Sequence, residues 1–245
     1  MSKTLITGAA SGIGLATAEL LAKAGHQLVL IDVNIGALAD TLPDQADAIR
    51  LPGDVADEHF WLSRADNFTG LTGAVVNAGV ASGGEIVDLD FAEWRRTLSV
   101  NLDGAFLTMR AALRVMTDGG AIVATASVSG IKAEPGTAAY GTSKAGLIQL
   151  VKVAAKEGAP RGIRVNTVAP GGVDTPIWDG MPFFTDLIAS EGSRGAAMVA
   201  MAKMATPLGK YASAAEIAGQ IAFLLSDAAA SVTGAVLVAD GGYSL

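Results

Sequence analysis

The chain has 245 residues, of which 51% are hydrophobic and 17% charged, with no cysteine and a net charge of −7. The absence of cysteine excludes disulfides, thiolate nucleophiles and cysteine-ligated metal sites, and it fits a reducing compartment. The acidic balance, without any cluster of Lys or Arg, argues against nucleic acid or a membrane surface as partner, and no apolar run approaches the roughly 18 residues that cross a bilayer. With no room for a signal peptide before Gly8, we expect a soluble cytoplasmic protein.

Short apolar runs alternate with longer stretches of helical spacing from end to end. The runs predict buried strands at 4–7, 27–32, 48–51, 73–77, 121–126, 164–168 and 235–239. The longer stretches predict helices that include 14–24, 91–116, 142–156 and 214–225. Strands that are apolar throughout and separated by helices indicate a parallel sheet covered on both faces. We therefore expect an α/β fold in which a single doubly wound sheet of about seven strands takes up the whole of 1–245.

The segment 176–207 departs from this alternation. It lies between two predicted strands, is longer than an ordinary connection, and carries aromatic residues followed by Met198, Met201 and Met204 at three-residue spacing. We expect one or two short helices that form a lid over a binding site. For the methionine stripe alone, ordinary packing on an amphipathic helix is the favoured alternative.

A glycine-rich turn, Thr7-Gly8-Ala9-Ala10-Ser11-Gly12-Ile13-Gly14, joins the first predicted strand to the first predicted helix. Glycines at such a turn let the backbone approach a pyrophosphate, which then meets the positive end of the helix. Asp32 ends the second strand, where an acid accepts hydrogen bonds from the adenosine ribose hydroxyls; a solvent-facing cap is the alternative. A carboxylate there would repel a 2′-phosphate, and the nearest cations in sequence are Lys23 and Arg50. The pair of features predicts dinucleotide binding, with NAD favoured over NADP.

Tyr140 and Lys144 are four residues apart and share one face of a predicted helix. A free phenol has a pKa near ~10, but an ammonium ~4 Å away at an effective dielectric of ~20 contributes about 4 kcal/mol, or roughly three pK units. That shift would make the tyrosine a usable acid and base. A chance surface pair is the alternative. Ser127, at the end of the fifth strand, supplies a hydroxyl that could polarise a carbonyl oxygen beside the tyrosine.

Taken together, these elements resemble the short-chain dehydrogenases/reductases in order and spacing over essentially the whole chain. The matching residues are Thr7–Gly14, Asn77-Ala78-Gly79, Asn101, Ser127, Tyr140-x-x-x-Lys144 and Pro170-Gly171. The resemblance implies a single Rossmann-type domain, a nicotinamide cofactor and a homotetramer. It implies that Tyr140 is the proton donor and acceptor, and that Lys144 lowers its pKa and binds the nicotinamide ribose. By the same matching, Ser127 holds the substrate oxygen and Asn101 keeps a water in the proton relay.

The resemblance also implies the cofactor contacts. Besides Tyr140 and Lys144, they are Gly8, Ser11, Gly12, Ile13 and Gly14 of the turn, Asp32 and Val33, the adenine-side pair Asp54 and Val55, the turn Asn77, Ala78 and Gly79, and Pro170, Gly171, Val173 and Thr175 for the carboxamide and inner phosphate. The customary N-N-A-G turn reads Val76-Asn77-Ala78-Gly79, so one asparagine is missing from a position we interpret as structural. Ser11 and Gly12 stand where NADP-preferring reductases often place an arginine, which agrees with the preference for NAD.

The expected function is hydride transfer between a hydrophobic secondary alcohol or ketone and NAD, without a metal. Candidate substrate contacts are Ser129, Trp178, Met181 and Phe184, although packing is the commoner role for each residue of the lid. A 3-oxoacyl-type reductase is the rival within the family, and Arg194 and Lys203 offer no obvious clamp for its substrate. A non-catalytic dinucleotide-binding regulator, or an isomerase or dehydratase on this fold, remain open. The apolar helices 91–116 and 142–156 are candidate subunit interfaces.

Overall fold

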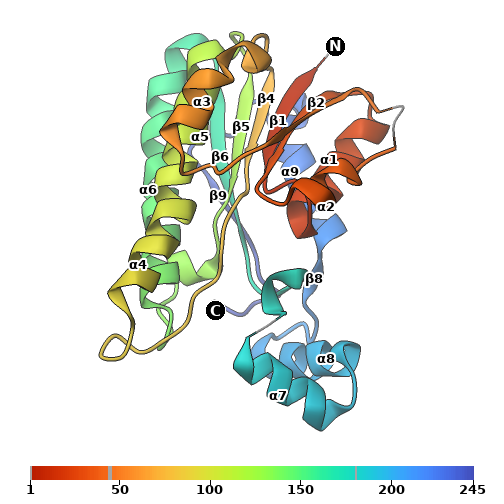
Figure 1. The fold of residues 1–245 in the computed structure, drawn as a ribbon, viewed down its shortest axis with the longest axis vertical. Helices are drawn as coiled ribbons and strands as arrows, with labels where there is room; N and C mark the ends of the chain where they lie inside the picture. The colour runs from red at the N-terminus through yellow and green to blue at the C-terminus, as the bar shows by residue number, and fades with distance from the viewer. Residues whose placement is uncertain (1, 44–45, 180) are drawn as a thin grey trace.

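The computed structural model describes residues 2–43, 46–179 and 181–245, and a parallel sheet lies at its centre (Figure 1). The sheet has the strand order β3-β2-β1-β4-β5-β6-β9. The chain runs from β1 outward to β3, returns to β4 beside β1, and then runs outward to the other edge. This doubly wound, Rossmann-type arrangement confirms the expected fold. The strands are β1 (Lys3–Thr7), β2 (Gln27–Asp32), β3 (Ala48–Pro52), β4 (Gly73–Val76), β5 (Ala121–Thr125), β6 (Arg164–Pro170) and β9 (Val236–Ala239).

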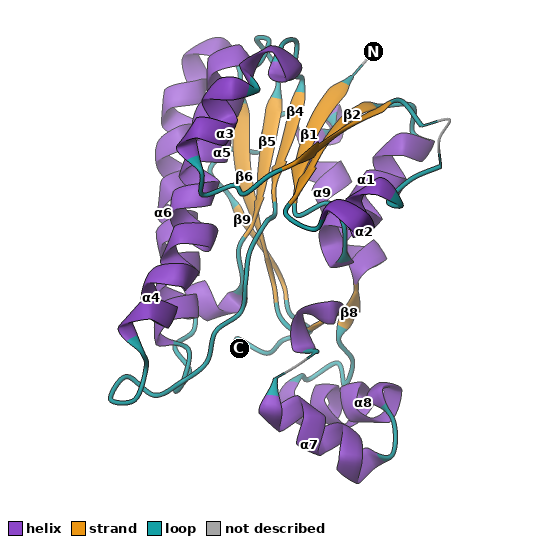
Figure 2. Cartoon of the chain, in the orientation of Figure 1, coloured by secondary structure: helices purple, strands orange, loops and turns teal. Residues whose placement is uncertain are grey.

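Helices cover both faces of the sheet, as Figure 2 shows. One face carries α1 (Gly12–Lys23), α2 (Ile35–Ala39) and α9 (Ala214–Leu225), and the other carries α3 (Glu58–Ser63), α4 (Phe91–Leu98), α5 (Gly104–Val115) and α6 (Ala138–Gly158). Among the described helices, none combines the length and apolarity needed to span a membrane.

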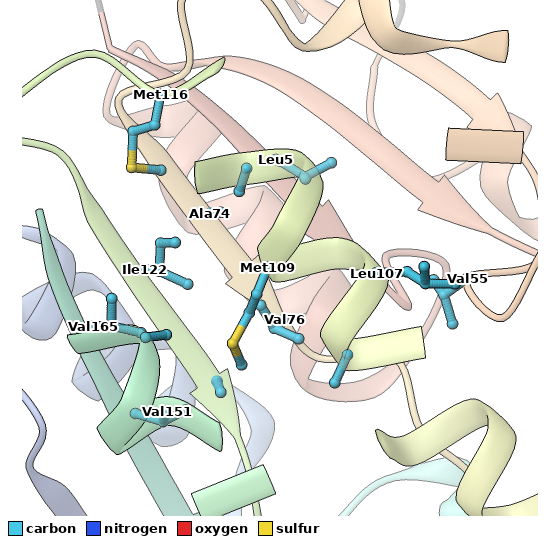
Figure 3. Packing of buried hydrophobic residues seen from close by; sticks show 14 of the residues in the cluster. Leu5, Val55, Ala74, Val76, Leu107, Met109, Met116, Ile122, Val151 and Val165 are labelled. Atoms are coloured by element: carbon cyan, nitrogen blue, oxygen red, sulfur yellow. The ribbon is translucent and has the colours of Figure 1, made fainter. Parts of the chain in front are cut away.

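Successive strand residues alternate between two apolar clusters, which is why the strands are apolar throughout. Leu5 belongs to the cluster beneath α5 and α6, and its neighbour Ile6 to the cluster beneath α1 and α9. Figure 3 shows the first cluster, in which Leu5 and Ile122 of the strands lie near Met109 of α5. Both faces of the sheet are therefore buried, and polar side chains that could bind a ligand or catalyse a reaction are expected at the ends of the strands.

Two helices differ from their predicted bounds in ways that matter for the site. The predicted helix 91–116 is interrupted, because a π-helical turn, η2 (Ser99–Asp103), separates α4 from α5. Single π turns of this kind are frequent at functional sites. The predicted helix 142–156 begins earlier, at Ala138, so that Tyr140 lies in the first turn of α6.

The segment 176–207 forms helices, as expected, beyond the carboxyl ends of the strands (Figure 1). It contains a 3₁₀ turn, η5 (Pro176–Trp178), followed by α7 (Pro182–Glu191) and α8 (Arg194–Ala205). The segment leaves and returns through a short parallel pair that the sequence did not predict, β7 (Val173–Asp174) with β8 (Ala212–Ser213). Its helices have an apolar cluster of their own, with Phe184, Ala197 and Met198 buried.

The remaining short elements are 3₁₀ turns: η1 (Ala65–Phe68), η3 (Val128–Gly130), η4 (Ala159–Arg161) and η6 (Asp227–Ala229). Of these, η3 bears on the site, because it follows β5 directly and begins next to Ser127.

Candidate active site

The glycine-rich turn between β1 and α1 depends on the absence of side chains. Gly8 and Gly12 have φ angles of +66° and +53°, which favour glycine, and a Cβ on Gly14 would collide with the carbonyl oxygen of Gly8. Ser11 precedes α1, and its side chain caps none of the backbone N–H groups of the first helical turn. The turn therefore presents close-approaching backbone and helix N–H groups, which suit the pyrophosphate of a dinucleotide.

The turn is held from below by the end of β4. The Asn77 side chain donates to the carbonyl oxygens of Thr7 (3.1 Å) and Gly8 (3.3 Å), and the Thr7 hydroxyl accepts from the backbone N–H groups of Asn77 (3.0 Å) and Ala78 (3.1 Å). A Cβ on Gly8 would lie 2.9 Å from Cα of Ala78. The Asn77 side chain thus braces the turn rather than reaching outward.

Asp32, at the end of β2, lies beside the glycine-rich turn. Its carboxylate accepts hydrogen bonds from the backbone N–H groups of Ala10 (3.0 Å) and Asn34 (2.9 Å). These bonds orient the carboxylate at the edge of the turn, where a ribose would lie if a pyrophosphate occupied the turn. Val33 is exposed next to it.

The predicted adenine-side pair is divided between surface and core. Asp54 is exposed and accepts from the backbone N–H of Ala56 (2.9 Å), whereas the Val55 side chain is buried against α5. A Cβ on Gly104 would lie 2.6 Å from a methyl carbon of Val55, and the Val55 carbonyl accepts from the Trp61 indole (2.8 Å). The Val55 side chain is therefore a packing group, and only its backbone could meet an adenine.

Asn101 and Lys144 meet at Gly79. Asn101 is fully buried in the π turn, and its amide accepts from the N–H of Val80 (2.8 Å) and donates to the Val80 carbonyl (3.0 Å). A Cβ on Gly79 would lie 3.2 Å from Oδ1 of Asn101 and 3.3 Å from Nζ of Lys144. The sequence places these residues far apart, and the fold brings them to one point at the carboxyl edge of the sheet.

Ser127 and Tyr140 complete this cluster. The Ser127 hydroxyl accepts from the backbone N–H of Ser129 (3.1 Å), and it lies near enough to the Tyr140 phenol to lower the pKa of that phenol. The four predicted catalytic residues thus come together from the end of β5, the π turn and the first two turns of α6.

Two connecting groups in this cluster escaped the sequence analysis. Ser143 donates to the Tyr140 carbonyl (2.7 Å) and accepts from the Asn101 amide (3.0 Å), and so it links α6 to the π turn. The Thr125 carbonyl accepts from Nζ of Lys144 at 3.0 Å. Ser143 lies three residues after Tyr140 on the same helix face, a spacing that could have identified it. The role of the Thr125 carbonyl could not have been predicted, because every residue has a backbone carbonyl whatever its side chain.

The electrostatics of the tyrosine and lysine differ from the expectation. Burial lowers the pKa of Lys144 to about 8, and burial raises the pKa of Tyr140, with the nearby Ser127 hydroxyl opposing part of that rise. We expected the ammonium to lower the tyrosine pKa from ~4 Å away. Instead, Nζ points to the Thr125 carbonyl and lies 5.7 Å from the centroid of the Tyr140 ring. In this structure the desolvation of the phenol outweighs the effect of Ser127, and the tyrosine pKa is raised where we expected it to be lowered, so that expectation was wrong.

The loop after β6 faces the glycine-rich turn. The N–H of Gly171 donates to the Ala239 carbonyl (3.1 Å), which fixes the start of the loop next to Pro170, and Val173 is buried in β7. A Cβ on Gly12 would lie 3.3 Å from Cβ of Thr175. The two stretches predicted to hold the cofactor phosphates are therefore adjacent.

The candidate substrate contacts of the 176–207 segment take part in its own packing. The Trp178 ring stacks on Tyr211, with centroids 6.1 Å apart, and its indole donates to the Val173 carbonyl (2.7 Å). Phe184 has no exposed surface, so it is a core residue of the segment in this structure. Met181 is half-buried against the same cluster, and Ser129 lies in η3 beside Ser127. Met198 is buried, in line with the packing alternative, whereas Met204 is 77% exposed.

Comparisons with known proteins agree with this geometry. A family model described as enoyl-(acyl carrier protein) reductase matches residues 8–244. A cis-4-hydroxycyclohexanecarboxylate dehydrogenase of Sinomonas cyclohexanicum is 40% identical, covering 98% of this chain and 95% of that protein. A D-threitol dehydrogenase of Mycolicibacterium smegmatis is 38% identical, covering 98% of this chain and 92% of that protein. The solved structure of carveol dehydrogenase from Mycobacterium avium in complex with NAD superposes with a TM-score of 0.91 at 29% identity, covering 99% of this chain and 97% of that one.

Proposed function

Because the chain belongs to the short-chain dehydrogenase/reductase family, we propose that it is an NAD-dependent dehydrogenase of hydrophobic secondary alcohols that also reduces the matching ketones. The observation that carries the proposal is the convergence of Ser127, Tyr140, Lys144 and Asn101 at the carboxyl edge of the sheet. The similar proteins named dehydrogenases support oxidation of an alcohol by this chain.

The residues of the crevice fit a dinucleotide. The glycine-rich turn and Thr175 would hold the pyrophosphate, and Asp32 would accept from the adenosine ribose hydroxyls. The Asp32 carboxylate, held by two backbone N–H groups, would oppose a 2′-phosphate, which favours NAD over NADP. When bound, the nicotinamide accepts or supplies the hydride.

The protein groups hold the substrate oxygen and move its proton. The Ser127 hydroxyl lies beside the Tyr140 phenol, so a substrate hydroxyl placed between them would bond to both. Tyr140 takes the hydroxyl proton, as the phenolate, in the oxidative direction and returns it in the reductive direction. Lys144 passes the proton toward the solvent at the exposed Gly79, and Asn101, which lies at the same point, holds a water of that relay. Catalysis of this kind relies on positioning, because burial raises the pKa of Tyr140 in this structure.

The 176–207 segment acts, in this proposal, as a lid on the single domain 1–245. Its aromatic residues and the pairing of its arginine favour an uncharged, hydrophobic substrate. Arg194 forms ion pairs with Asp174 (2.5 Å) and Asp179 (3.0 Å). Because its charge is already paired, it does not favour the binding of a phosphorylated substrate. Carveol, named for one similar protein, is an uncharged cyclic secondary alcohol, and we infer a related cyclic alcohol here.

The assembly is proposed to be a homotetramer that uses the face formed by α5 and α6. A groove of about 280 Å³ runs between these helices. It is lined mainly by apolar residues such as Phe106, Leu150 and Val153, and Arg110, Arg114 and Glu157 also line it. Phe106 and Val153 are exposed there, and an exposed apolar groove favours a self-complementary contact with a second copy. The cytoplasmic location expected from composition stays a prediction.

The direct test follows nicotinamide absorbance with NAD and, separately, with NADP over a panel of cyclic secondary alcohols and their ketones. Turnover with NAD and little with NADP would support both the reaction and the role of Asp32. Better turnover with NADP would contradict the role of Asp32. A preference for 3-oxoacyl thioesters would favour the reductase alternative, and cofactor binding without any turnover would favour a binding protein.

A further inference from the structure

A single hydroxyl group connects two parts of the candidate active site that come from different elements. Ser143 lies between Tyr140 and Lys144 in α6, and its side chain has no exposed surface. The hydroxyl donates to the backbone carbonyl of Tyr140 (2.7 Å) and accepts from the side-chain amide of Asn101 (3.0 Å) in the π turn. Both of these bonds lead to residues of the candidate active site.

The amide of Asn101 has one orientation that satisfies its neighbours. Its oxygen accepts from the N–H of Val80 (2.8 Å), and its nitrogen donates to the Val80 carbonyl (3.0 Å) and to the Ser143 hydroxyl. Because a backbone N–H only donates and a carbonyl only accepts, a flipped amide would lose both bonds to Val80. Both N–H groups of the amide are therefore used, and its oxygen keeps one lone pair for a further donor.

This oxygen lies close to the ammonium group of Lys144. A Cβ on the exposed Gly79 would be 3.2 Å from Oδ1 of Asn101 and 3.3 Å from Nζ of Lys144. Two polar atoms that lie this close to one point can be bridged by a single water. The orientation of the Asn101 amide therefore decides whether an acceptor or a donor is offered to a water beside Lys144.

Apolar packing holds α6 against the π turn independently of the hydroxyl. A Cβ on Gly146 of α6 would lie 3.1 Å from a methyl carbon of Leu102 in the π turn, so the two elements are in close contact. Loss of the Ser143 hydroxyl would leave this contact intact. It would also leave one N–H of the fully buried Asn101 amide without a partner, which is unfavourable and favours rotation of the amide toward another acceptor.

We propose that Ser143 is a positioning residue of the proton relay, because its hydroxyl completes the set of bonds that orients Asn101 beside Lys144. The inference rests on the proposed function. In the oxidative direction, the proton that Tyr140 takes from the alcohol leaves through Lys144 and a water at Asn101, which regenerates the phenolate. Ser143 acts through Asn101, and no part in binding the alcohol or NAD is assigned to it.

Steady-state oxidation of the best cyclic alcohol with NAD by Ser143→Ala tests the proposal. We expect kcat to fall by about tenfold, since misplaced groups slow a reaction by factors of this order, while the KM values for alcohol and NAD stay unchanged. The solvent deuterium isotope effect on kcat should rise, because proton transfer becomes the slow step. On the background of Asn101→Ala, the same substitution should cause no further fall in kcat, because Ser143 acts through Asn101.

Thr108→Val is the matched control. Thr108 in α5 is as deeply buried as Ser143, and its hydroxyl donates to a carbonyl of its own helix, that of Gly104 (2.7 Å). The variant therefore loses a buried hydroxyl and a bond to a helix carbonyl, and its kcat and isotope effect should equal those of the wild type. An equal fall of kcat in the control, or a fall caused by Ser143→Ala that is as large without Asn101 as with it, would overturn the proposal.

Hydrogen exchange supplies a second readout that needs no substrate. In Ser143→Ala we expect the backbone amides of the π turn, 99–103, to exchange faster than in the wild type, while those of α9 do not change. Unchanged exchange at 99–103 would refute the link between Ser143 and Asn101 even if the chain oxidised no alcohol. A wild type without turnover would instead refute the proposed function, so the two failures are distinguishable.

Discussion

Lys144 is a buried cation, and its burial ties the stability of the fold to pH. Its pKa is lowered to about 8 from an ordinary value of 10.5. Between these values the unfolded chain binds more protons than the folded protein, so the free energy of unfolding rises with pH there, by about 3 kcal/mol in total. Below pH 8 both states hold the proton, and the destabilisation by the buried charge is fully present.

In the variant Lys144→Met, the free energy of unfolding should lack the rise that titration of Lys144 causes between pH 8 and pH 10.5. We expect the unfolding free energy of the wild type, minus that of the variant, to increase between pH 8 and pH 10.5 and to be flat between pH 6 and pH 7. Urea titrations of the two proteins at matched pH values measure the difference. The lost bond to the Thr125 carbonyl shifts the whole curve without changing its slope. Parallel pH curves would show that Lys144 is not titrating as the structure indicates.

The substitution Gly79→Ala tests whether the close approach of Asn101 and Lys144 matters for turnover. The methyl group of Gly79→Ala would lie 3.2–3.3 Å from both polar side chains, so one of them must give way. Because misplacing such groups is costly, we expect kcat to fall by about tenfold or more. Gly219→Ala in α9 is the matched control: nothing lies within 4 Å of its added methyl group, and kcat should not change. Equal activity in both variants would contradict the assigned geometry.

At the scale of residues, the sequence predicted those parts of the candidate active site in which a side chain carries the chemistry. Ser127, Tyr140 and Lys144 could be proposed from residue type and spacing alone. The pKa of Tyr140 could not, because it depends on desolvation and on the direction of the ammonium, which turns to a backbone carbonyl. The burial of the Val55 side chain likewise follows from the neighbouring Gly104 of α5, which is distant in sequence.

At the scale of elements, the π turn shows where periodicity fails. Apolar spacing continues through 99–103, so the sequence predicts one helix over 91–116. The extra residue in the turn places Asn101 against Val80 and Ser143, and these contacts come from other elements. The β7–β8 pair has only two residues in each strand, too few to produce an alternating pattern. Both features are tertiary in origin.

Arg194 links the start of α8 to the stretch through which the chain enters the lid segment. Its guanidinium bonds to Asp174 and Asp179 and donates to the Thr175 carbonyl (2.9 Å). We expect Arg194→Met to loosen the segment, since these residues precede α7 while Arg194 begins α8. Hydrogen exchange of α7 should become faster, with that of α9 as the internal reference. Unchanged exchange in α7 would show that the apolar cluster around Phe184 alone holds the segment.

At the scale of the whole molecule, composition and alternation were enough to predict a doubly wound parallel sheet. Strand residues such as Leu5 and Ile6 are both buried, on opposite faces, and continuous apolar strands are the signature of that arrangement. The order of the strands was not predicted, because it depends on which pairs adjoin after the chain reverses from β3 to β4. That reversal is what creates the crevice at the carboxyl edge.

The proposed assembly makes a prediction at the same scale. Phe106→Glu would place a charge in the apolar groove between α5 and α6 and oppose its burial against a second copy. We expect light scattering to give the mass of four chains for the wild type and a smaller assembly for the variant. Ile177→Glu, an exposed apolar position of comparable accessibility in η5, serves as the control and should leave the mass unchanged. A monomeric wild type would contradict the proposed tetramer.

The central claim is that Tyr140 moves the substrate proton at the edge of a dinucleotide crevice, and Tyr140→Phe tests it most directly. The variant keeps the ring but loses the phenol hydroxyl beside Ser127. We predict that turnover of the best cyclic alcohol with NAD falls by at least about 10²-fold, a typical contribution of acid–base catalysis. The dissociation constant of NAD, measured by titration on the same preparations, should stay nearly the same. Turnover that survives the loss of the phenol would contradict the account.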